Sequence, residues 1–237
     1  LQTAREAVPG FQGFEFDYPP ASSGTRARLE QAAGRLGLVC GGQWEMTAPV
    51  LDLLDGPGAG MAAANGRHVI KRERALRRLG TLDVEHTSDG EKIRGALDAF
   101  FEQHIERFQG KPIPSAFEKE EHRAFFRRLT HLAGRAGWLR FTRVDWNGRP
   151  IGFHFGYCFR GRYFWNEPSF ALDMARYSPG KLLLRHLLLA AIAEGARLFD
   201  FGTVDQAFKL SMATHVNRVQ GCRLFPRDEA EAEAGAA

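Results

Sequence analysis

The sequence predicts an α/β fold with a mixed, mostly antiparallel sheet and flanking helices. Residues 138–167 alternate apolar and polar side chains around Asn147-Gly148 and Arg160-Gly161, two dipeptides typical of tight hairpin turns. This pattern predicts three consecutive antiparallel strands. The apolar segment 182–192 that follows predicts a helix buried against the same sheet.

The chain has 237 residues, of which 44% are hydrophobic and 25% are charged. These values lie near the average of globular proteins and exclude collagen-like, coiled-coil, disulfide-rich and wholly disordered chains. The length corresponds to one large domain, or to one domain and a part of another. The longest apolar segment is much shorter than the roughly 20 residues of a membrane-spanning helix, so we expect no membrane span.

The first part of the chain predicts short elements that end at a glycine-rich segment, residues 55–66. In chain order they are a strand at 14–16, a helix at 23–36, and extended pieces at 38–44 and 49–53. The 55–66 segment has the Gly and Pro content of a linker. We therefore expect a lead-in segment over residues 1–66, a main domain over 67–226, and a disordered, acidic, Ala-rich tail over 227–237.

The main domain predicts helices and strands in a mixed order. The helices lie at 67–79, 89–108, 116–136, 180–196 and 206–212, and the strands at 81–86, 138–146, 151–159, 162–167, 197–201 and 216–225. Ser88 with Glu91, and Ser115 with Glu118, fit the capping box, in which a hydroxyl and a carboxylate satisfy the first N–H groups of a helix. These pairs predict where the second and third of these helices begin.

Cysteine spacing and net charge limit the location and the partners. Cys40, Cys158 and Cys222 are odd in number and far apart, so they predict neither a zinc site nor a disulfide framework. We expect a reducing, cytoplasmic location and no metal. The formal net charge is +4, and it is more positive without the acidic tail. A basic domain suits an anionic partner, which can be a phosphorylated cofactor, a nucleic acid or a membrane surface.

The segment 176–181, Arg-Tyr-Ser-Pro-Gly-Lys, predicts an anion-binding turn. The N–H groups at the start of the following helix, the positive end of its dipole and the Lys181 side chain converge there. Gly180 lets a phosphate approach the backbone, because a Cβ would obstruct it. The alternative is that Ser178 and Pro179 are an ordinary N-cap and first-turn proline.

The order of elements is that of the GNAT acyltransferases. The residues also resemble the GNAT-like acetyltransferase domain of bacterial polysaccharide-biosynthesis and cellulose-cluster proteins. The similar segments are 103–108, 176–184, 199–202 and 208–209, and the resemblance covers about residues 70–226. The family's usual glycine-rich phosphate loop is replaced here by Ser178-Pro179-Gly180, and Phe208 stands where the family more usually has Tyr. Because members often carry two such units in tandem, residues 1–66 are a lead-in or the remnant of a first unit.

The resemblance implies transfer of an acyl group, acetyl from acetyl-CoA or another acyl-CoA, to an amine or hydroxyl. The acceptor is a saccharide, sugar nucleotide or amino-acid-like small molecule. In this family two central strands splay apart, the pantetheine arm lies between them, and the pyrophosphate meets the start of the next helix. The implied cofactor-binding residues are Tyr177, Ser178, Gly180, Lys181 and Leu182. Nucleic acid is not expected as a partner unless the donor is a tRNA, and the oligomeric state is open.

Three residues are the predicted catalytic group: Asp200, Lys209 and His154. Asp200 ends the strand at 197–201 and either orients the acceptor or caps the next turn. Lys209 resembles a lysine of Fem-type aminoacyltransferases that balances charge during transfer, or it is a surface lysine. His154 lies on the middle hairpin strand and either relays a proton or is structural. Glu167, Asp173 and Tyr177 are further candidates for proton transfer.

Two other functions remain open. The first is Fem-like aminoacyl transfer from charged tRNA, in which the basic helix at 67–79 contacts phosphates. The alternative for this helix is a solvated face, because it lacks aromatic residues that would stack on bases. The second is a non-catalytic module of the same fold that binds a phosphorylated ligand.

Overall fold

A computed structural model describes residues 1–8, 10–54, 57–203 and 207–226. The chain forms two compact units, and both are discontinuous in sequence. The small unit contains residues 1–49, 203–211 and the chain from 215 onward, and the large unit contains residues 50–202 and 212–214. This division differs from the predicted boundary after residue 66, because the last strand pairs with the first one. The predicted tail, residues 227–237, lies outside the described residues.

The large unit is built on a mixed sheet. Its strands are β3 (Leu82–Thr87), β4 (Leu139–Trp146), β5 (Arg149–Phe159), β6 (Arg162–Phe170), β7 (Leu198–Asp200) and the end of β2 (Leu38–Asp52). They are arranged in the order β2-β7-β6-β5-β4-β3, and every adjacent pair is antiparallel except the parallel pair β6 and β7. The predicted mixed, mostly antiparallel sheet is confirmed.

The two hairpin turns between β4, β5 and β6 adopt the backbone that the sequence predicts. Asn147 and Gly148 have φ values of 51° and 75°, and Arg160 and Gly161 have 50° and 75°. Positive φ at both central residues is the signature of the type I′ turn, whose twist matches that of the strands it joins. The three-stranded antiparallel segment is therefore specified locally.

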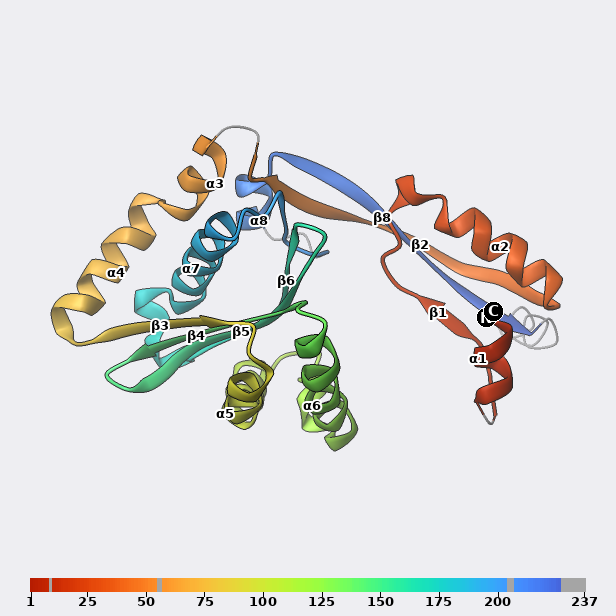
Figure 1. Ribbon diagram of the computed structural model, residues 1–237, viewed down its shortest axis with the longest axis horizontal. Coiled ribbons are helices and arrows are strands. Elements are labelled where there is room, and N and C mark those ends of the chain that lie inside the picture. The colour runs from red at the N-terminus through yellow and green to blue at the C-terminus, as the bar shows by residue number, and fades with distance from the viewer. Residues whose placement is uncertain (9, 55–56, 204–206, 227–237) are drawn as a thin grey trace. The chain divides into compact units, whose positions relative to one another are not determined.

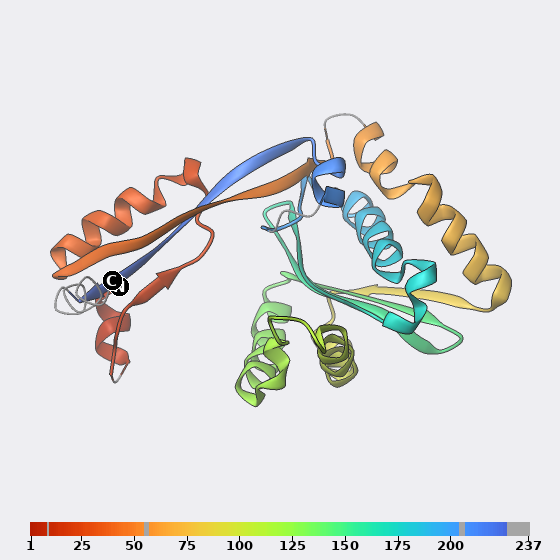
Figure 2. The ribbon, with the colours of Figure 1, turned by 180° about the vertical axis from the view of Figure 1, so that it is seen from behind.

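Helices cover both faces of this sheet (Figures 1 and 2). One face carries α5 (Gly90–Phe108), the short 3-10 helix η2 (Ala116–Glu118) and α6 (Glu120–Arg135), and the other carries α3 (Pro57–Ala64), α4 (Arg67–Leu79) and α7 (Pro179–Ala193). The core under α5 and α6 is rich in phenylalanine: Phe100, Phe101, Phe117, Phe126, Phe141, Phe153 and Phe155. The short 3-10 helix η3 (Leu172–Tyr177) joins β6 to α7.

The predicted linker at 55–66 is wrong for most of its length, because residues 57–64 form α3. Residues 55 and 56 lie outside the described part. A Cβ on Gly60 would lie 2.9 Å from Leu53 Cδ2 and 3.1 Å from Ile192 Cδ1 of α7. The glycine therefore permits close packing of α3, which the composition of the segment alone does not reveal.

The helix starts follow the predicted capping with one change. Asp89, and not Ser88, caps α5, because its carboxylate accepts a hydrogen bond of 2.9 Å from the Glu91 N–H. Ser115 accepts a hydrogen bond of 3.1 Å from the Phe117 N–H, as expected, but it caps η2. The predicted helix at 116–136 is thus divided into η2 and α6.

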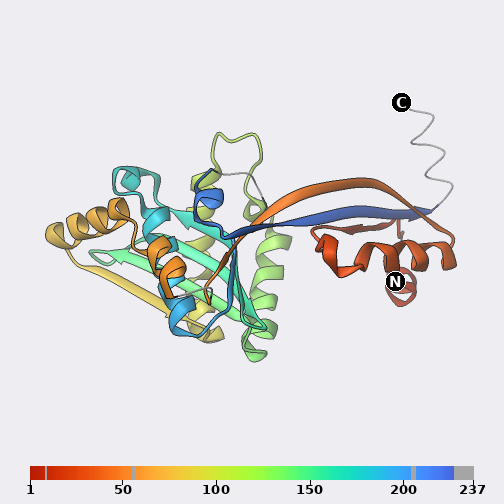
Figure 3. The same ribbon diagram turned by 90° about the horizontal axis from the view of Figure 1, so that it is seen from above.

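The small unit contains α1 (Gln2–Ala7), β1 (Phe14–Phe16), the 3-10 helix η1 (Ala21–Ser23), α2 (Thr25–Arg35), most of β2, α8 (Ala207–Met212) and β8 (His215–Pro226). Its strands follow the order β1-β8-β2, and β2 and β8 lie side by side (Figure 3). The two extended pieces predicted at 38–44 and 49–53 are one continuous strand, β2. Its core centres on Ala33, Leu38, Cys222 and Leu224.

Candidate active site

The parallel strands β6 and β7 separate after three paired residues. Arg162–Phe164 pairs with Leu198–Asp200, and β6 then continues to Phe170 while the chain after β7 turns at Gly202, which has φ 70°. Among the described residues, this edge of β6 has no strand partner beyond Phe164. The Asn166 N–H and the Pro168 carbonyl of this stretch are bonded to His154 and Arg107, and Pro168 has no N–H, so an extended ligand could pair only with the remaining backbone groups of the open edge.

A bulge reshapes β6 where it leaves β7. Tyr157 pairs with Phe164 and Phe155 with Glu167, so β5 advances by two residues while β6 advances by three. A bulge inserts one extra residue and redirects the side chains that follow it. Glu167 lies immediately after this irregularity.

Glu167 projects toward α5, where it meets His104. Its Oε2 lies 3.4 Å from His104 Nε2, and the Glu167 side chain is 35% exposed while that of His104 is 5% exposed. His104 Nδ1 lies 2.8 Å from the Ser115 hydroxyl. The arrangement is a carboxylate that solvent can reach, backed by a buried imidazole.

The same helix presents Arg107 and Gln103 to the sheet. The Arg107 guanidinium hydrogen-bonds the Pro168 carbonyl and stacks on the Phe170 ring at 4.4 Å, and burial lowers the pKa of Arg107 against the opposing effect of Glu167. Gln103 donates to the Pro150 carbonyl at 3.1 Å. Gln103 Oε1 and Arg107 Nε are buried and have no hydrogen-bond partner within the described chain.

Tyr157 adds a neutral phenol to this side of the sheet. Burial and the nearby Glu167 carboxylate raise its pKa to about 12, so the hydroxyl keeps its proton near neutral pH. The Tyr157 and Glu167 side chains are thus an uncharged donor and an ionisable acceptor on neighbouring strands.

The predicted anion-binding turn begins α7. Ser178 adopts the left-handed conformation at φ 55°, and its carbonyl accepts hydrogen bonds from the Lys181 and Leu182 N–H groups. Lys181 is exposed, whereas Leu182 is completely buried and Tyr177 is 8% exposed. The Leu182 side chain is buried and its N–H donates to Ser178, so Leu182 offers a ligand no free donor, whereas the Lys181 side chain is exposed.

Gly180 packs against an aromatic ring. A Cβ on Gly180 would lie 2.9 Å from Cδ1 and from Cε1 of Phe170. The ring that stacks on Arg107 therefore also contacts the first turn of α7. The Phe170 ring is sufficient to explain why residue 180 is a glycine. A bound phosphate that also needs this space is compatible with that explanation.

His154 is fully buried on β5. Burial, with a smaller effect of His86, lowers the pKa of His154 to about 3, so the imidazole is neutral. Its Nε2 accepts a hydrogen bond of 3.2 Å from the Asn166 N–H in the bulge, and its ring stacks on Trp165 at 5.1 Å. This geometry favours the structural alternative, in which His154 fixes the bulge.

Asp200 and Lys209 lie in different compact units. Asp200 accepts a hydrogen bond of 2.9 Å from the Gly202 N–H and pairs with Arg162 at 3.3 Å, so it caps the turn that ends β7. Lys209 is 6% exposed and donates to the Thr203 carbonyl at 3.0 Å. The two residues stay predictions as catalytic groups.

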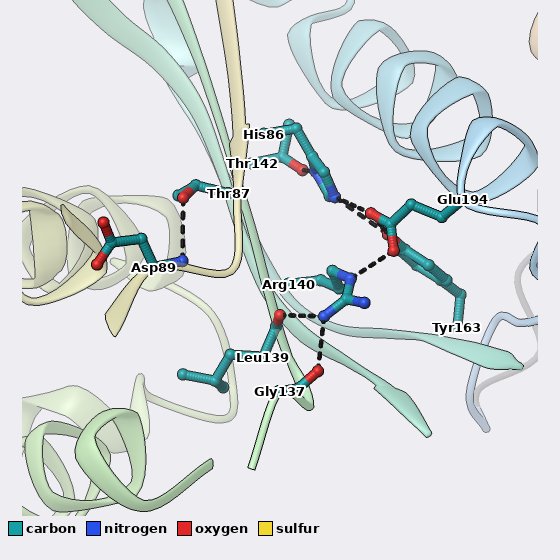
Figure 4. Close-up of polar contacts among 9 residues, drawn as sticks. All are labelled: His86, Thr87, Asp89, Gly137, Leu139, Arg140, Thr142, Tyr163 and Glu194. Carbon is teal, nitrogen blue, oxygen red and sulfur yellow. Dashed lines mark hydrogen bonds and ion pairs between the residues drawn. The ribbon is translucent and has the colours of Figure 1, made fainter. Parts of the chain in front are cut away.

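A second polar cluster ties the other end of α7 to the sheet (Figure 4). Glu194 accepts hydrogen bonds from Tyr163 at 2.5 Å and from Arg140 at 2.7 Å, and it lies 3.1 Å from His86. Thr142 contacts the other nitrogen of His86 at 2.7 Å. Since α7 is 15 residues long, this cluster lies about 20 Å from the Ser178 turn. Its groups satisfy one another, and we interpret it as structural.

A comparison with family models identifies the family of this chain. The family model described as the acetyltransferase (GNAT) domain matches residues 64–210, which is more than half of the chain. The chain belongs to this GNAT acetyltransferase family. This GNAT domain is an acyltransferase domain.

Solved structures share the fold. FemX superposes with a TM-score of 0.59 at 12% identity, covering 92% of this chain and 74% of that chain. A C-terminal domain assigned to a lysylphosphatidylglycerol synthetase of Agrobacterium fabrum gives 0.57 at 12% identity, covering 99% and 74%. L-PGS from Bacillus licheniformis gives 0.51 at 11% identity, covering 88% and 67%. A comparison with curated proteins found no match.

In the part of the chain that the structure describes, no helix has both the length and the apolarity needed to cross a lipid bilayer. The described residues also contain no cluster of three or more metal-ligating side chains.

Proposed function

We propose that this domain transfers an acyl group from an acyl-CoA, with acetyl-CoA as the donor, to an amine or hydroxyl of a saccharide or amino-acid-like acceptor. The observation that supports it is the position of Glu167. A partly exposed carboxylate follows the bulge at which β6 leaves β7, beside the open strand edge. A thioester bound along that edge would place its carbonyl near the carboxylate.

Glu167 is the proposed general base. Attack by an amine on a thioester requires removal of an N–H proton, and a carboxylate within reach accepts it. The C–N bond then forms, the C–S bond breaks, and the departing thiolate takes up a proton to give free CoA. Glu167 is preferred to the predicted relay His154, because the His154 imidazole is fully buried and its pKa of about 3 makes it too weak a base near neutral pH.

The start of α7 is the proposed pyrophosphate site. The Lys181 side chain is exposed beside the first helical turn, where the positive end of the helix dipole favours an anion. Binding of the donor is tested by measuring the melting temperature of the protein with acetyl-CoA, with longer acyl-CoAs and with aminoacyl-tRNA. A donor that binds the folded chain raises its melting temperature by mass action.

Turnover is then measured as thiol release from acetyl-CoA with amino sugars and amino acids as acceptors. We expect Glu167→Gln to lower kcat by about a hundredfold, the usual scale for losing a general base. The exposed Glu102→Gln on α5 is the matched control. Full turnover in Glu167→Gln would remove Glu167 from the chemistry.

A second candidate is Fem-like transfer from aminoacyl-tRNA, and α4 is the observation that favours it. Its exposed face carries a straight row of cations at spacings of four, three and four residues: Arg67, Lys71, Arg74 and Arg78. None of the four forms an ion pair with a residue that the structure describes. Like charges at these spacings repel one another, and a row of phosphates would relieve the repulsion.

Salt dependence separates this candidate from acyl-CoA transfer. If α4 contacts tRNA phosphates, affinity for tRNA falls steeply between 50 and 200 mM salt, by roughly two orders of magnitude for four contacts. Replacing the four cations of α4 by Gln should flatten that slope, whereas Arg128→Gln on α6 should not. Absence of tRNA binding at low salt would exclude the second candidate.

A further inference from the structure

His104 has an imidazole that its neighbours fix in one plane. The ring stacks on Phe108 at 4.5 Å and meets the edges of Phe117 at 4.9 Å and Phe100 at 5.9 Å. With 5% of the side chain exposed, a rotation of the ring would collide with these aromatic groups. The direction of its two nitrogens is therefore set by packing.

Both nitrogens of His104 point at polar groups from other elements. Nδ1 lies 2.8 Å from the Ser115 hydroxyl at the start of η2, and Nε2 lies 3.4 Å from Glu167 Oε2 on β6. The Ser115 oxygen is itself held by the hydrogen bond that it accepts from the Phe117 N–H at 3.1 Å. Polar contacts thus run from η2 through α5 to the carboxylate: a hydrogen bond between Ser115 and His104 Nδ1, and an ion-pair contact at 3.4 Å between His104 Nε2 and Glu167.

The chemistry of the groups assigns the protons along these contacts. An ionised carboxylate can only accept, so the hydrogen between His104 and Glu167 belongs to His104 Nε2. A neutral imidazole carries one hydrogen, so Nδ1 must accept, and the Ser115 O–H must donate to it. The Ser115 oxygen remains able to accept from Phe117 N–H, so every contact is compatible with one tautomer.

We propose that His104 is a positioning residue for acyl transfer, which holds one oxygen of the Glu167 carboxylate so that the other can take the proton of the acceptor. Ser115 sets the tautomer that makes this possible. The proposal rests on the proposed function, in which Glu167 is the base. The sequence places His104 and Glu167 far apart, and only the packing of α5 over β6 brings them together.

Steady-state kinetics with acetyl-CoA and glucosamine test the role. His104→Leu should lower kcat about tenfold or more, with the KM for acetyl-CoA unchanged, because a positioning residue acts on the chemical step. His104→Gln should restore part of the loss, since its amide N–H can donate to the carboxylate. Combining His104→Leu with Glu167→Gln should lower kcat no further than Glu167→Gln alone, because the histidine acts through the carboxylate.

The outcomes separate the two proposals. Full turnover in Glu167→Gln overturns the assignment of the base, and the positioning role falls with it. Loss of turnover in Glu167→Gln with full turnover in His104→Leu overturns the positioning role alone. The melting temperatures of all variants, with the exposed Glu102→Gln as control, identify a variant that fails to fold. If His104→Leu fails to fold, the turnover of His104→Gln tests the positioning role in its place.

A spectroscopic measurement tests the same arrangement without any substrate. Nitrogen-15 spectra of the folded protein should show His104 as the neutral Nε2–H tautomer. Observation of the Nδ1–H tautomer would reverse the hydrogen bond with Ser115, leave Nε2 with no hydrogen to offer the carboxylate, and overturn the proposal. If the wild type does not turn over glucosamine, observation of the Nδ1–H tautomer still overturns the proposal.

Discussion

The Phe170 ring occupies the space in which Gly180 would carry a side chain. The distance from the position of a Cβ on Gly180 to the ring is 2.9 Å, shorter than real Cβ contacts. The Arg107 guanidinium stacks on the same ring, 4.4 Å from the ring centroid. The start of α7 and the end of α5 are therefore connected through one aromatic side chain on β6.

Enlarging Gly180 should have two separable effects. Gly180→Val forces Phe170 to move, and overpacking of this kind costs about 1 to 3 kcal/mol in the free energy of unfolding. It should also weaken binding of acetyl-CoA by more than tenfold, because the turn is the proposed pyrophosphate site. Combining Gly180→Val with Phe170→Leu should recover stability but not affinity.

Urea unfolding and calorimetry measure these two effects. Gly95→Ala is the control, since Gly95 lies on α5 with nothing within 4 Å of a new Cβ and should gain stability from helix propensity. Recovery of affinity together with stability in the double variant would show that Gly180 serves only packing.

Asp200 and Lys209 remain to be tested as catalytic groups. If they act in transfer, Asp200→Asn and Lys209→Ala should each lower kcat by about a hundredfold with little change in the affinity for acetyl-CoA. If Asp200 only caps the turn at Gly202, Asp200→Asn keeps an acceptor oxygen there and retains its turnover. Thiol release under saturating acetyl-CoA distinguishes these results.

The hairpins and the helix positions could be predicted because their determinants are local. Asn147-Gly148 forms its turn through the conformations that these two residues prefer. Gly60 shows the opposite case. The glycine content of the segment around Gly60 predicts a loop. The segment is a helix, in which Gly60 leaves room for Ile192, a residue distant in sequence. Ser88 fits the capping box, but the adjacent Asp89 caps α5.

The site was harder to predict because it depends on which faces meet. Glu167 could be named from the sequence only as one carboxylate among several, since its partner His104 comes from another element. His104 and Arg107 do lie in the 103–108 segment that resembles the family, and their three-residue spacing places them on one helix face. The residue type of His154 predicts a role in proton transfer, whereas its complete burial is a property of the packed sheet.

Acid should destabilise the protein through His154. Its folded pKa of about 3 lies below the usual value, so the unfolded chain binds a proton first as the pH falls below about 6.5. Stability is then lost as the pH falls from 6.5 toward 3, and the loss from pH 7 to pH 5 is about 2 kcal/mol. His154→Gln should lose less stability over this interval than the exposed His131→Gln, as measured by urea unfolding. Equal losses in the two variants would contradict the burial of a neutral imidazole.

The Glu194 cluster should contribute stability with its own pH dependence. Burial would raise the pKa of Glu194, but the hydrogen bonds from Tyr163 and Arg140 outweigh it and hold the pKa below the usual value. A depressed carboxylate pKa means that the stabilisation is complete above the unfolded pKa and is lost as the pH falls through the folded pKa. Glu194→Gln should therefore lower the free energy of unfolding at pH 7 by about 2 kcal/mol, the scale of hydrogen bonds to a charged group.

Urea unfolding at pH 7 and at about pH 3 checks this expectation. The difference between wild type and Glu194→Gln should shrink as the pH falls through the lowered folded pKa of Glu194, because protonation of the wild-type carboxylate removes the charge that strengthens its hydrogen bonds. Tyr163→Phe removes one of the two hydrogen bonds and should cost less than Glu194→Gln, because Arg140 still pairs with the carboxylate at 2.7 Å. Thiol release should be unaffected in both variants, since the cluster lies at the end of α7 remote from the Ser178 turn. A loss of turnover without a loss of stability would instead place Glu194 in the function of the domain.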